Sequence, residues 1–544
     1  MAIYLGLDSS TQSLTAVAIE VDGPRRRVVF QHSFAFDAEL PTYGTRAGVL
    51  PGSDPGVVTA PPRMWAEALD RLMGVVARES GLPLGGTRAI AGSAQQHGSV
   101  YLTAAAGAAL AALDPAHPLV GQIAGIFARD DAPIWMDAST AEQCEAITAA
   151  LGGPDALARL TGSRAFERFT GPQIRKYAEQ DPAGYARTDR IHLVSSFLAS
   201  LLAGRHAPID HGDGGGMNLM DLAGRRWAPA ALRATAPDLE RRLPALAPSE
   251  TVVGTLAPYW TRRYGFPPAK VVAWSGDNPS SLIGTGIVRE GRLAVSLGTS
   301  DTLFAFLREP RFDPSGTGHV FGSPTGDYLT LTCCRNGSLA RDRVRREHGL
   351  DWEGFSNALR HTPAGNGGAI LLPWFEPEIT PTVPAPGARR YGLDPTDGPA
   401  NVRAVVEAQM LALALHSHWM GVRVEGIHAT GGAARNREIL QVMADVFAAD
   451  VYQLDVANSA CLGAALRAYH ADLASDERRL PWDEVVAGFA EPAAGTRVHP
   501  VPAHVARYVE LRKVYAACEA HALGRGGDPR PLIAAFRLRF PHSP

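Results

Sequence analysis

The stretch that decides the fold runs from Val271 to Leu282 and reads Val-Val-Ala-Trp-Ser-Gly-Asp-Asn-Pro-Ser-Ser-Leu. Its short apolar run ends at Trp274 and is bounded by turn residues, so we predict a buried strand rather than a helix. Gly276 then allows a turn, which Asp277 follows. Open α/β sheets bind their ligands just past the strand ends, so Asp277 is a candidate general base. The alternative is an ordinary turn residue, because Asp is common in turns.

Two polar turns follow the same pattern in the two halves of the chain. One runs from Asp8 to Ser13 and the other from Gly298 to Thr302, each between two short apolar runs. Both patterns predict a β-hairpin. Hydroxyls and backbone N–H groups in such a turn suit a phosphate, and the Asp8 carboxylate suits Mg²⁺, usually through water. An ordinary hairpin is the alternative for the first turn, because Ser, Asp and Thr are common in turns. The recurrence of the pattern indicates an internal duplication with a ligand between the halves.

Length and composition bound the class of protein. A chain of 544 residues is too long for one ordinary core, so we predict two domains, residues 1–284 and 285–544. The net charge of −3 argues against a broad nucleic-acid surface. No uncharged apolar run is long enough to cross a bilayer, and the N-terminus lacks a signal-type apolar core. We therefore expect a soluble cytoplasmic protein without membrane contact.

The five cysteines fit this expectation. Their number is odd and their spacing is not that of a metal site, so reduced thiols are expected. For the adjacent pair Cys333 and Cys334, packing within a strand is favoured over a disulfide.

Three further segments carry polar or glycine-rich patterns. The run from Gln95 to Ser99 contains His97 at a predicted strand end, where it would suit sugar hydroxyls, although a lone His is more often structural. The run from Asp210 to Asn218 predicts a long turn, either a surface loop or a place where backbone approaches a ligand. The segment from Ile427 to Asn436 reads as strand, glycine turn and helix start, which lets backbone lie against a planar ring or a phosphate.

Two nucleotide-binding signatures are missing. The glycine turn lacks the third glycine of the Rossmann fingerprint, and no Walker A sequence occurs anywhere in the chain. The last ~25 residues are rich in Arg, Gly and Pro, and we expect them to be poorly ordered.

Taken in order, these segments resemble those of the FGGY carbohydrate kinases, within the actin-like ATPase superfamily. The likeness runs from Leu5 to about Leu466, and within the family it is nearest to the longer kinases of xylulose that also occur in animals. The segments that carry it are Gln95–Val100, Trp135–Asp137, Arg168–Pro172, Gly276–Ser281, Leu297–Leu303 and Ala457–Cys461. The resemblance implies an α/β fold of two actin-like (ribonuclease H-like) domains flanking a deep cleft.

The resemblance also implies a reaction and a set of site residues. The reaction is transfer of a phosphoryl group from ATP, with Mg²⁺, to D-xylulose, giving D-xylulose 5-phosphate, with Asp277 as the general base. The residues implied for the sugar are His97, Arg168, Asp277 and Asn278. Asp8 is implied for Mg²⁺. The residues implied for the β- and γ-phosphates are Thr11, Gln12, Gly298, Thr299 and Ser300, and those for the adenosine are Trp352, Gly432, Ala433 and Asn436.

One position departs from the family pattern. Many relatives carry Lys or Arg two residues after the serine that matches Ser13, whereas this chain has Thr15. A cation facing the phosphates is therefore absent there or supplied by another part of the chain.

Two other functions stay open. One is an FGGY kinase for another sugar or polyol, such as ribulose or glycerol. The other is a non-catalytic, actin-like sensor of sugar or nucleotide, against which Asp277 counts. The partners expected are a ketopentose and ATP, with no nucleic acid and no membrane, and a homodimer is an open possibility.

Overall fold

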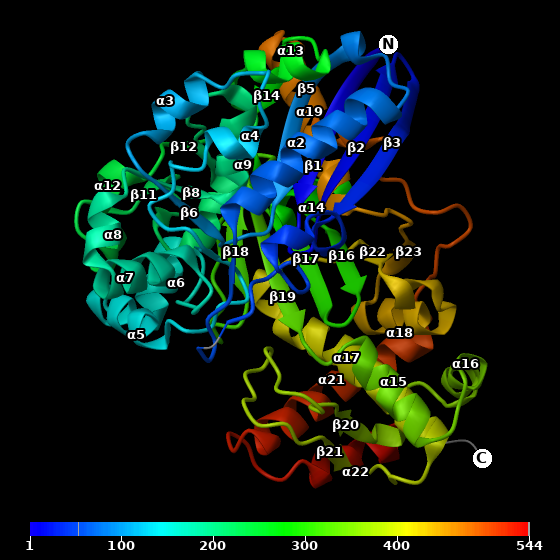
Figure 1. Cartoon of the computed structure of the whole chain (residues 1–544). Coiled ribbons are helices and arrows are strands. Elements are labelled where there is room, and N and C mark those ends of the chain that lie inside the picture. Colours follow the sequence, from blue (N-terminus) through cyan, green and yellow to red (C-terminus); the bar gives the residue numbers. More distant parts are fainter. Residues whose placement is uncertain (53, 542–544) are drawn as a thin grey trace.

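The computed structural model describes residues 1–52 and 54–541 and contains two large β-sheets, one above the other in Figure 1, with helices on their faces. Each sheet starts with an antiparallel meander and continues with parallel strands. This repeated layout confirms the predicted class, a pair of ribonuclease H-like α/β domains.

The first sheet has the strand order β13-β14-β5-β1-β2-β3, with β15 also paired to β5. Its strands are β1 (Ala2–Ser9), β2 (Ser13–Asp22), β3 (Arg25–Ala35), β5 (Thr87–Ala94), β13 (Val252–Thr255), β14 (Lys270–Val272) and β15 (Ser275–Gly276). The predicted hairpin is β1–β2, in which Asp8 lies opposite Thr15.

The second sheet has the order β18-β19-β17-β16-β22-β23. Its strands are β16 (Arg292–Leu297), β17 (Asp301–Leu307), β18 (His319–Gly322), β19 (Tyr328–Cys334), β22 (Gly426–Thr430) and β23 (Asp450–Gln453). The run β19-β17-β16-β22-β23 repeats β3-β2-β1-β5-β14 of the first sheet in order and direction. Both predicted hairpins therefore open equivalent halves of a duplicated fold.

Alternation along β1 explains how the first sheet is covered on both faces. Ile3, Leu5 and Leu7 belong to the core under α2 (Pro62–Glu79), and Tyr4 belongs to the core under α19 (Ser459–Ser475). Successive side chains of a strand point to opposite faces, so a strand that is apolar throughout needs a helix on each side. One of these two helices comes from late in the sequence, so the two halves are interleaved.

The remaining long helices complete the layers around the two sheets (Figure 1). They are α5 (Ala141–Ala150), α6 (Pro154–Thr161), α7 (Thr170–Gln180), α9 (Val194–Ala203), α14 (Asp277–Gly284), α15 (Ser338–Glu347), α16 (Trp352–His361), α17 (Gly398–His416), α18 (Arg437–Phe447), α21 (Pro502–Ala522) and α22 (Arg530–Arg539). No helix among the described residues is both long and apolar enough to cross a membrane.

Two sequence-based expectations are wrong. The run Asp210–Asn218 is not a surface loop: it forms the short helix α10 (His211–Gly214) and a 3₁₀ turn, and Asp213 within it is buried. The C-terminal tail is ordered through α22, because Ile533 and Phe536 are buried in the hydrophobic core around the second sheet. Residues 542–544, which the same expectation covers, lie outside the described part of the chain. The cysteine prediction is confirmed, since all five thiols are free and Cys333 and Cys334 lie in β19.

Candidate active site

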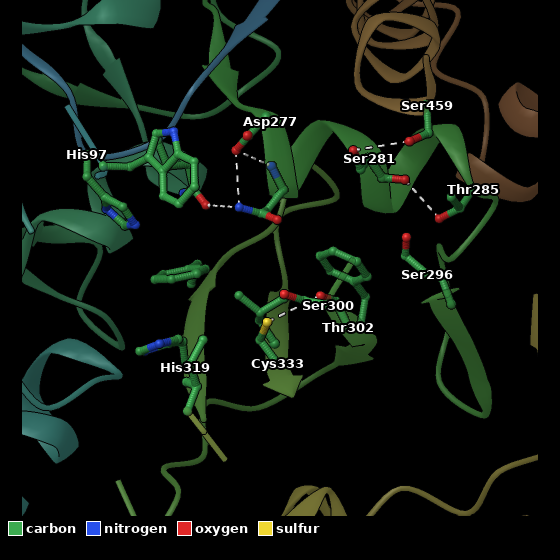
Figure 2. A pocket seen from close by; sticks show the side chains of 18 of the residues that line it. His97, Asp277, Ser281, Thr285, Ser296, Ser300, Thr302, His319, Cys333 and Ser459 are labelled. Atoms are coloured by element: carbon green, nitrogen blue, oxygen red, sulfur yellow. Dashed lines mark hydrogen bonds between the residues drawn. The ribbon is translucent and has the colours of Figure 1, made fainter. Parts of the chain in front are cut away.

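A cleft of about 560 Å³ lies between the two sheets, with α14 along one wall (Figure 2). Side chains from both halves of the chain line it. The predicted site residues among them are His97, Arg168, Asp277, Asn278 and Ser300. The structure thus brings the four candidate sugar residues together beside one of the two candidate phosphate turns.

Asp277 is the first residue of α14, directly after β15. Its Oδ1 accepts hydrogen bonds from the backbone N–H of Asn278, at 2.8 Å, and from Asn278 Nδ2, at 3.1 Å. Burial, together with the negative charge of Asp8, raises the pKa of Asp277 to about 7. A carboxylate with a pKa near the working pH is suited to accept a proton and release it again.

Asp8 is the last residue but one of β1 and lies near Asp277, and its Oδ1 accepts a hydrogen bond from Ser93 Oγ. Burial raises the pKa of Asp8 to about 6. Two neighbouring carboxylates without a cation between them fit a divalent ion, and Mg²⁺ is usually held by one or two carboxylates plus water and phosphate oxygens. The described residues contain no cluster of three or more His, Cys, Asp or Glu side chains that could hold a metal ion.

His97 is held in one orientation at the end of the cleft. Its backbone φ is +72°, a left-handed conformation that is uncommon outside glycine, and strain of this kind is concentrated at functional sites. His97 Nδ1 lies 2.8 Å from the carbonyl oxygen of Gly216, and a Cβ on that glycine would approach the ring to 2.9 Å. Burial, with the charge of Arg168, lowers the pKa of His97 to about 3. The ring is therefore neutral, and with Nδ1–H donating, Nε2 is left to accept a hydrogen bond from a ligand.

Arg168 is a cation in the cleft without a carboxylate partner among the described residues. Its Nη2 lies 3.1 Å from His319 Nε2, while Phe166 and Phe169 face the guanidinium at 5.0 and 5.5 Å. Burial, with the charges of Arg168 and His97, lowers the pKa of His319 well below its usual range. A neutral His319 therefore accepts from Arg168 and leaves the remaining guanidinium donors for an oxygen-rich ligand.

His319 is a site residue that the sequence analysis missed. It comes from β18, 151 residues after Arg168, and no local pattern marks it. Ser281 and Thr285 also line the cleft, and for them a signal existed: together with Asp277 they are spaced by four residues, which places them on one helical face. Ser281 and Thr285 are labelled in Figure 2 along α14.

The glycine-rich segment from Asp210 to Asn218 packs next to the site residues His97 and Gln96. Asn278 Nδ2 donates to Gln96 Oε1 at 2.8 Å, so the nitrogen of the Gln96 amide faces away from Asn278. Beyond it, Asp213 of α10 accepts a hydrogen bond from Ser195 Oγ. Burial, together with the charge of Asp210, raises the pKa of Asp213 well above its usual range, and its neighbours Ser195 and Gln96 offset part of this rise. The carboxyl group of Asp213 is thus buried close to Gln96, the residue that accepts a hydrogen bond from Asn278.

The two hairpin turns lie on different sides of the cleft. Ser300 lines the cleft, and the turn that contains it is held to the start of α15 by hydrogen bonds from Gly337 N to Thr299 O and from Ser338 N to Gly298 O. In the first turn, Trp135 Nε1 donates to Thr11 Oγ1 at 2.8 Å, so a cleft residue contacts that turn as well. Gln12 is exposed beside it.

The four candidate adenosine residues do not line the cleft. Two of them are brought close through α16: Trp352 begins this helix, and Asn436 Nδ2 donates to Ser356 Oγ within it. Asn436 also caps α18, and Trp352 is 50% exposed with Arg345 over its ring. Gly432 and Ala433 lie in the 3₁₀ turn before Asn436. This arrangement leaves a solvent-facing aromatic surface near a glycine turn, outside the sugar end of the cleft.

Duplicated ribonuclease H-like domains around a cleft that Asp277 lines are the architecture of the actin-like ATPase superfamily. Family models for the N- and C-terminal domains of the FGGY family of carbohydrate kinases match residues 130–284 and 293–471. The chain belongs to this family and is an ATP-dependent carbohydrate kinase.

The relatives found by sequence and those found by structure differ in how closely their names agree on a substrate. Xylulose kinase of Mus musculus is 43% identical over 537 residues, covering 96% of this chain and 95% of the mouse protein. Crystal structures of xylulose kinase from Rhodospirillum rubrum and gluconate kinase from Lactobacillus acidophilus both have a TM-score of 0.79 at 18% identity, covering 96% of this chain and 99% and 98% of theirs. Because the same fold similarity holds for kinases named for two different substrates, the fold does not choose the sugar.

Proposed function

We propose that the protein transfers the γ-phosphoryl group of ATP to D-xylulose and forms D-xylulose 5-phosphate, with Asp277 as the general base. The observation that carries the proposal is the position of Asp277, at a helix start inside the cleft and among the sugar candidates, with a pKa raised to about 7. The choice of sugar is supported by the 43% identity to a protein named xylulose kinase.

The proposed mechanism assigns each cleft residue a task. Neutral His97 accepts a hydrogen bond from one sugar hydroxyl at Nε2, and Arg168 donates to the sugar oxygens. Asn278 holds the Asp277 carboxylate, whose free oxygen takes the proton from the attacking hydroxyl. Such transfer depends on positioning and charge stabilisation, because the protein forms no covalent bond to the substrate. Mg²⁺ held by Asp8 would neutralise part of the phosphate charge.

In the same proposal each half of the chain binds one of the two substrates. Residues 1–284 bind the sugar and residues 285–544 bind the nucleotide, with the β- and γ-phosphates between the two hairpin turns. Thr11, Gln12 and the turn Gly298–Ser300 contact the phosphates. The residues proposed for the adenosine are Trp352, Gly432, Ala433 and Asn436. The five free thiols fit a reducing compartment, and we propose a cytoplasmic location.

A panel of acceptors in a coupled ADP assay tests the sugar assignment. D-xylulose should give the highest kcat/KM among D-xylulose, D-ribulose, gluconate and glycerol. Glycerol is too short to reach His97, Arg168 and Asp277 at once, and each buried polar group left unpaired costs roughly 1–3 kcal/mol. If ribulose or glycerol is the better substrate, the xylulose assignment is wrong although the family assignment stands.

We expect His97→Asn to weaken sugar use and to leave ATP use nearly unchanged. Asn tolerates the left-handed backbone at this position, so the fold should be retained, while the shorter side chain cannot replace Nε2. Loss of one hydrogen bond in a buried site costs roughly 1–3 kcal/mol, or about 5- to 150-fold in kcat/KM for the sugar. The KM for each substrate is measured with the other saturating. A rise in the KM for ATP alone would show that the sugar pocket is misplaced.

A further inference from the structure

Arg335 lies beside the phosphate turn of the second sheet. In the antiparallel β17–β19 ladder Asp301 pairs with Cys334. Ser300, the residue before Asp301, therefore lies next to Arg335, the residue after Cys334. Successive residues of a strand alternate between faces, which places Arg335 on the same side as Cys333. Cys333, Arg335 and Ser300 all line the cleft that contains Asp277. Figure 2 shows Cys333 and Ser300 together on the wall opposite Asp277.

The guanidinium of Arg335 is unpaired among the described residues. Its backbone N–H donates to Glu378, but the exposed side chain has no hydrogen bond, ion pair or aromatic contact there. The next arginines along the chain are all paired with carboxylates. Arg341 pairs with Asp301, Arg343 with Glu347, and both Arg345 and Arg346 with Asp342. Arg335 is thus the one arginine of this region that is left free.

The opposite hairpin offers a negative charge and no cation. Thr15 lies directly across from Asp8 on neighbouring strands, so their side chains share one face. Thr15 Oγ1 is 2.9 Å from Ser33 Oγ and is turned to its own sheet. Asp8 and Asp277 are thus two neighbouring carboxylates on this side of the cleft, while Arg168 contacts His319 at the sugar end.

We propose that Arg335 binds the terminal phosphates of ATP and stabilises the charge on the transferred phosphoryl group. A triphosphate placed between two carboxylates needs positive charge beyond one Mg²⁺, and a guanidinium can donate two parallel hydrogen bonds to phosphate oxygens. Arg335 is on the cleft wall where Ser300 lies. Its guanidinium has no partner among the described residues that it would have to release in order to bind phosphate. This inference rests on the proposed function, since it needs ATP in the cleft.

Substitution of Arg335 tests the proposal by separating the phosphates from the rest of the substrates. We expect Arg335→Ala to lower kcat/KM for ATP by about 10- to 100-fold, because a hydrogen-bonded charge contact is removed. Arg335→Lys should retain part of the activity, and guanidinium ion added to Arg335→Ala should restore part of it. Titration calorimetry should show weaker binding of ATP by the Ala variant but unchanged binding of adenosine and of D-xylulose.

Arg343→Ala is the matched control, because Arg343 lies on the neighbouring helix α15 and is paired with Glu347 outside the cleft. Its kcat/KM for ATP should match that of the wild type. If the wild type phosphorylates sugar and Arg335→Ala keeps a kcat/KM for ATP within two-fold of the wild type, the role proposed for Arg335 is wrong, although the proposed function stands. If the wild type phosphorylates no sugar, the proposed function fails. The phosphate contact is tested separately by binding: if Arg335→Ala weakens the binding of ATP and of adenosine equally, Arg335 does not contact the phosphates.

Discussion

Asp277→Asn is expected to bind sugar and ATP but to transfer phosphate about 10²- to 10⁴-fold more slowly than the wild type, the usual cost of losing a general base. Asn preserves the size of the side chain and an oxygen that can accept from the backbone N–H of Asn278, which lies 2.8 Å from Asp277 Oδ1. It cannot take a proton from the attacking hydroxyl. The loss should therefore appear in kcat, with the Kd for sugar changed little.

The pH profile gives the same variant a second readout. Only the ionised carboxylate can act as a base, and the pKa of Asp277 is raised to about 7 by burial and by Asp8. Wild-type kcat/KM for the sugar should therefore fall as the pH drops below about 7, in proportion to the ionised fraction. The residual activity of Asp277→Asn should lack this acid limb.

Asp130→Asn is a suitable control for the Asp277 experiment. Asp130 is 81% exposed and lies outside the cleft, so the same chemical change there should leave the rate and the pH profile unaltered. Rates for Asp277→Asn within a few-fold of the wild type would mean that another group is the base.

Gly463→Ala should have the largest effect on stability. Gly463 lies in α19 where this helix crosses α14, and a Cβ there would lie 1.8 Å from the carbonyl oxygen of Ser280. The crossing is reciprocal, because a Cβ on Gly284 of α14 would lie 1.9 Å from the carbonyl oxygen of Ser459. Both obstacles are backbone atoms, so the helices must move apart.

The expected cost is about 3 kcal/mol or more, at the upper end of the usual penalty for overpacking. Because α14 begins at Asp277, the displacement should also lower kcat in whatever protein folds. The thermal midpoint and kcat are the measurements. Gly121→Ala is the control, since nothing lies within 4 Å of a Cβ at Gly121. An unchanged midpoint for Gly463→Ala would contradict the tight crossing of α14 and α19.

The parts of the fold that were predictable from sequence are those with local causes. The hairpins at Asp8–Ser13 and Gly298–Thr302 carry turn residues between apolar runs, and both form as predicted. The apolar run predicts Asp277 just past a buried strand, and Asp277 does begin α14 directly after β15. The turn predicted at Gly276 does not form, because Gly276 belongs to β15. Asp277 and Ser300 lie in one shared cleft between the duplicated halves, as the repeated turns already indicated, whereas the turn Asp8–Ser13 does not itself line that cleft.

The features that sequence reasoning missed depend on contacts between distant segments. The run from Asp210 to Asn218 looked like a loop because of its glycines, yet Asp213 is buried against Ser195 and helps to fix α10. The C-terminal helix is ordered by burial of Phe536 in a core built mainly from other segments. His319 reaches Arg168 only after β18 is placed in the sheet, so no local pattern predicts it.

The central claim, that the cleft directs the phosphoryl group of ATP to a sugar hydroxyl, is tested most directly by ³¹P NMR of the complete reaction with ATP, Mg²⁺ and D-xylulose. One sugar phosphomonoester should appear for each ADP formed, with its phosphorus coupled to the protons on carbon 5. The same sample with Asp277→Asn should show almost no product over the same time. Formation of ADP with inorganic phosphate as its only partner, or ATP that stays intact in the presence of the sugar, would contradict the account.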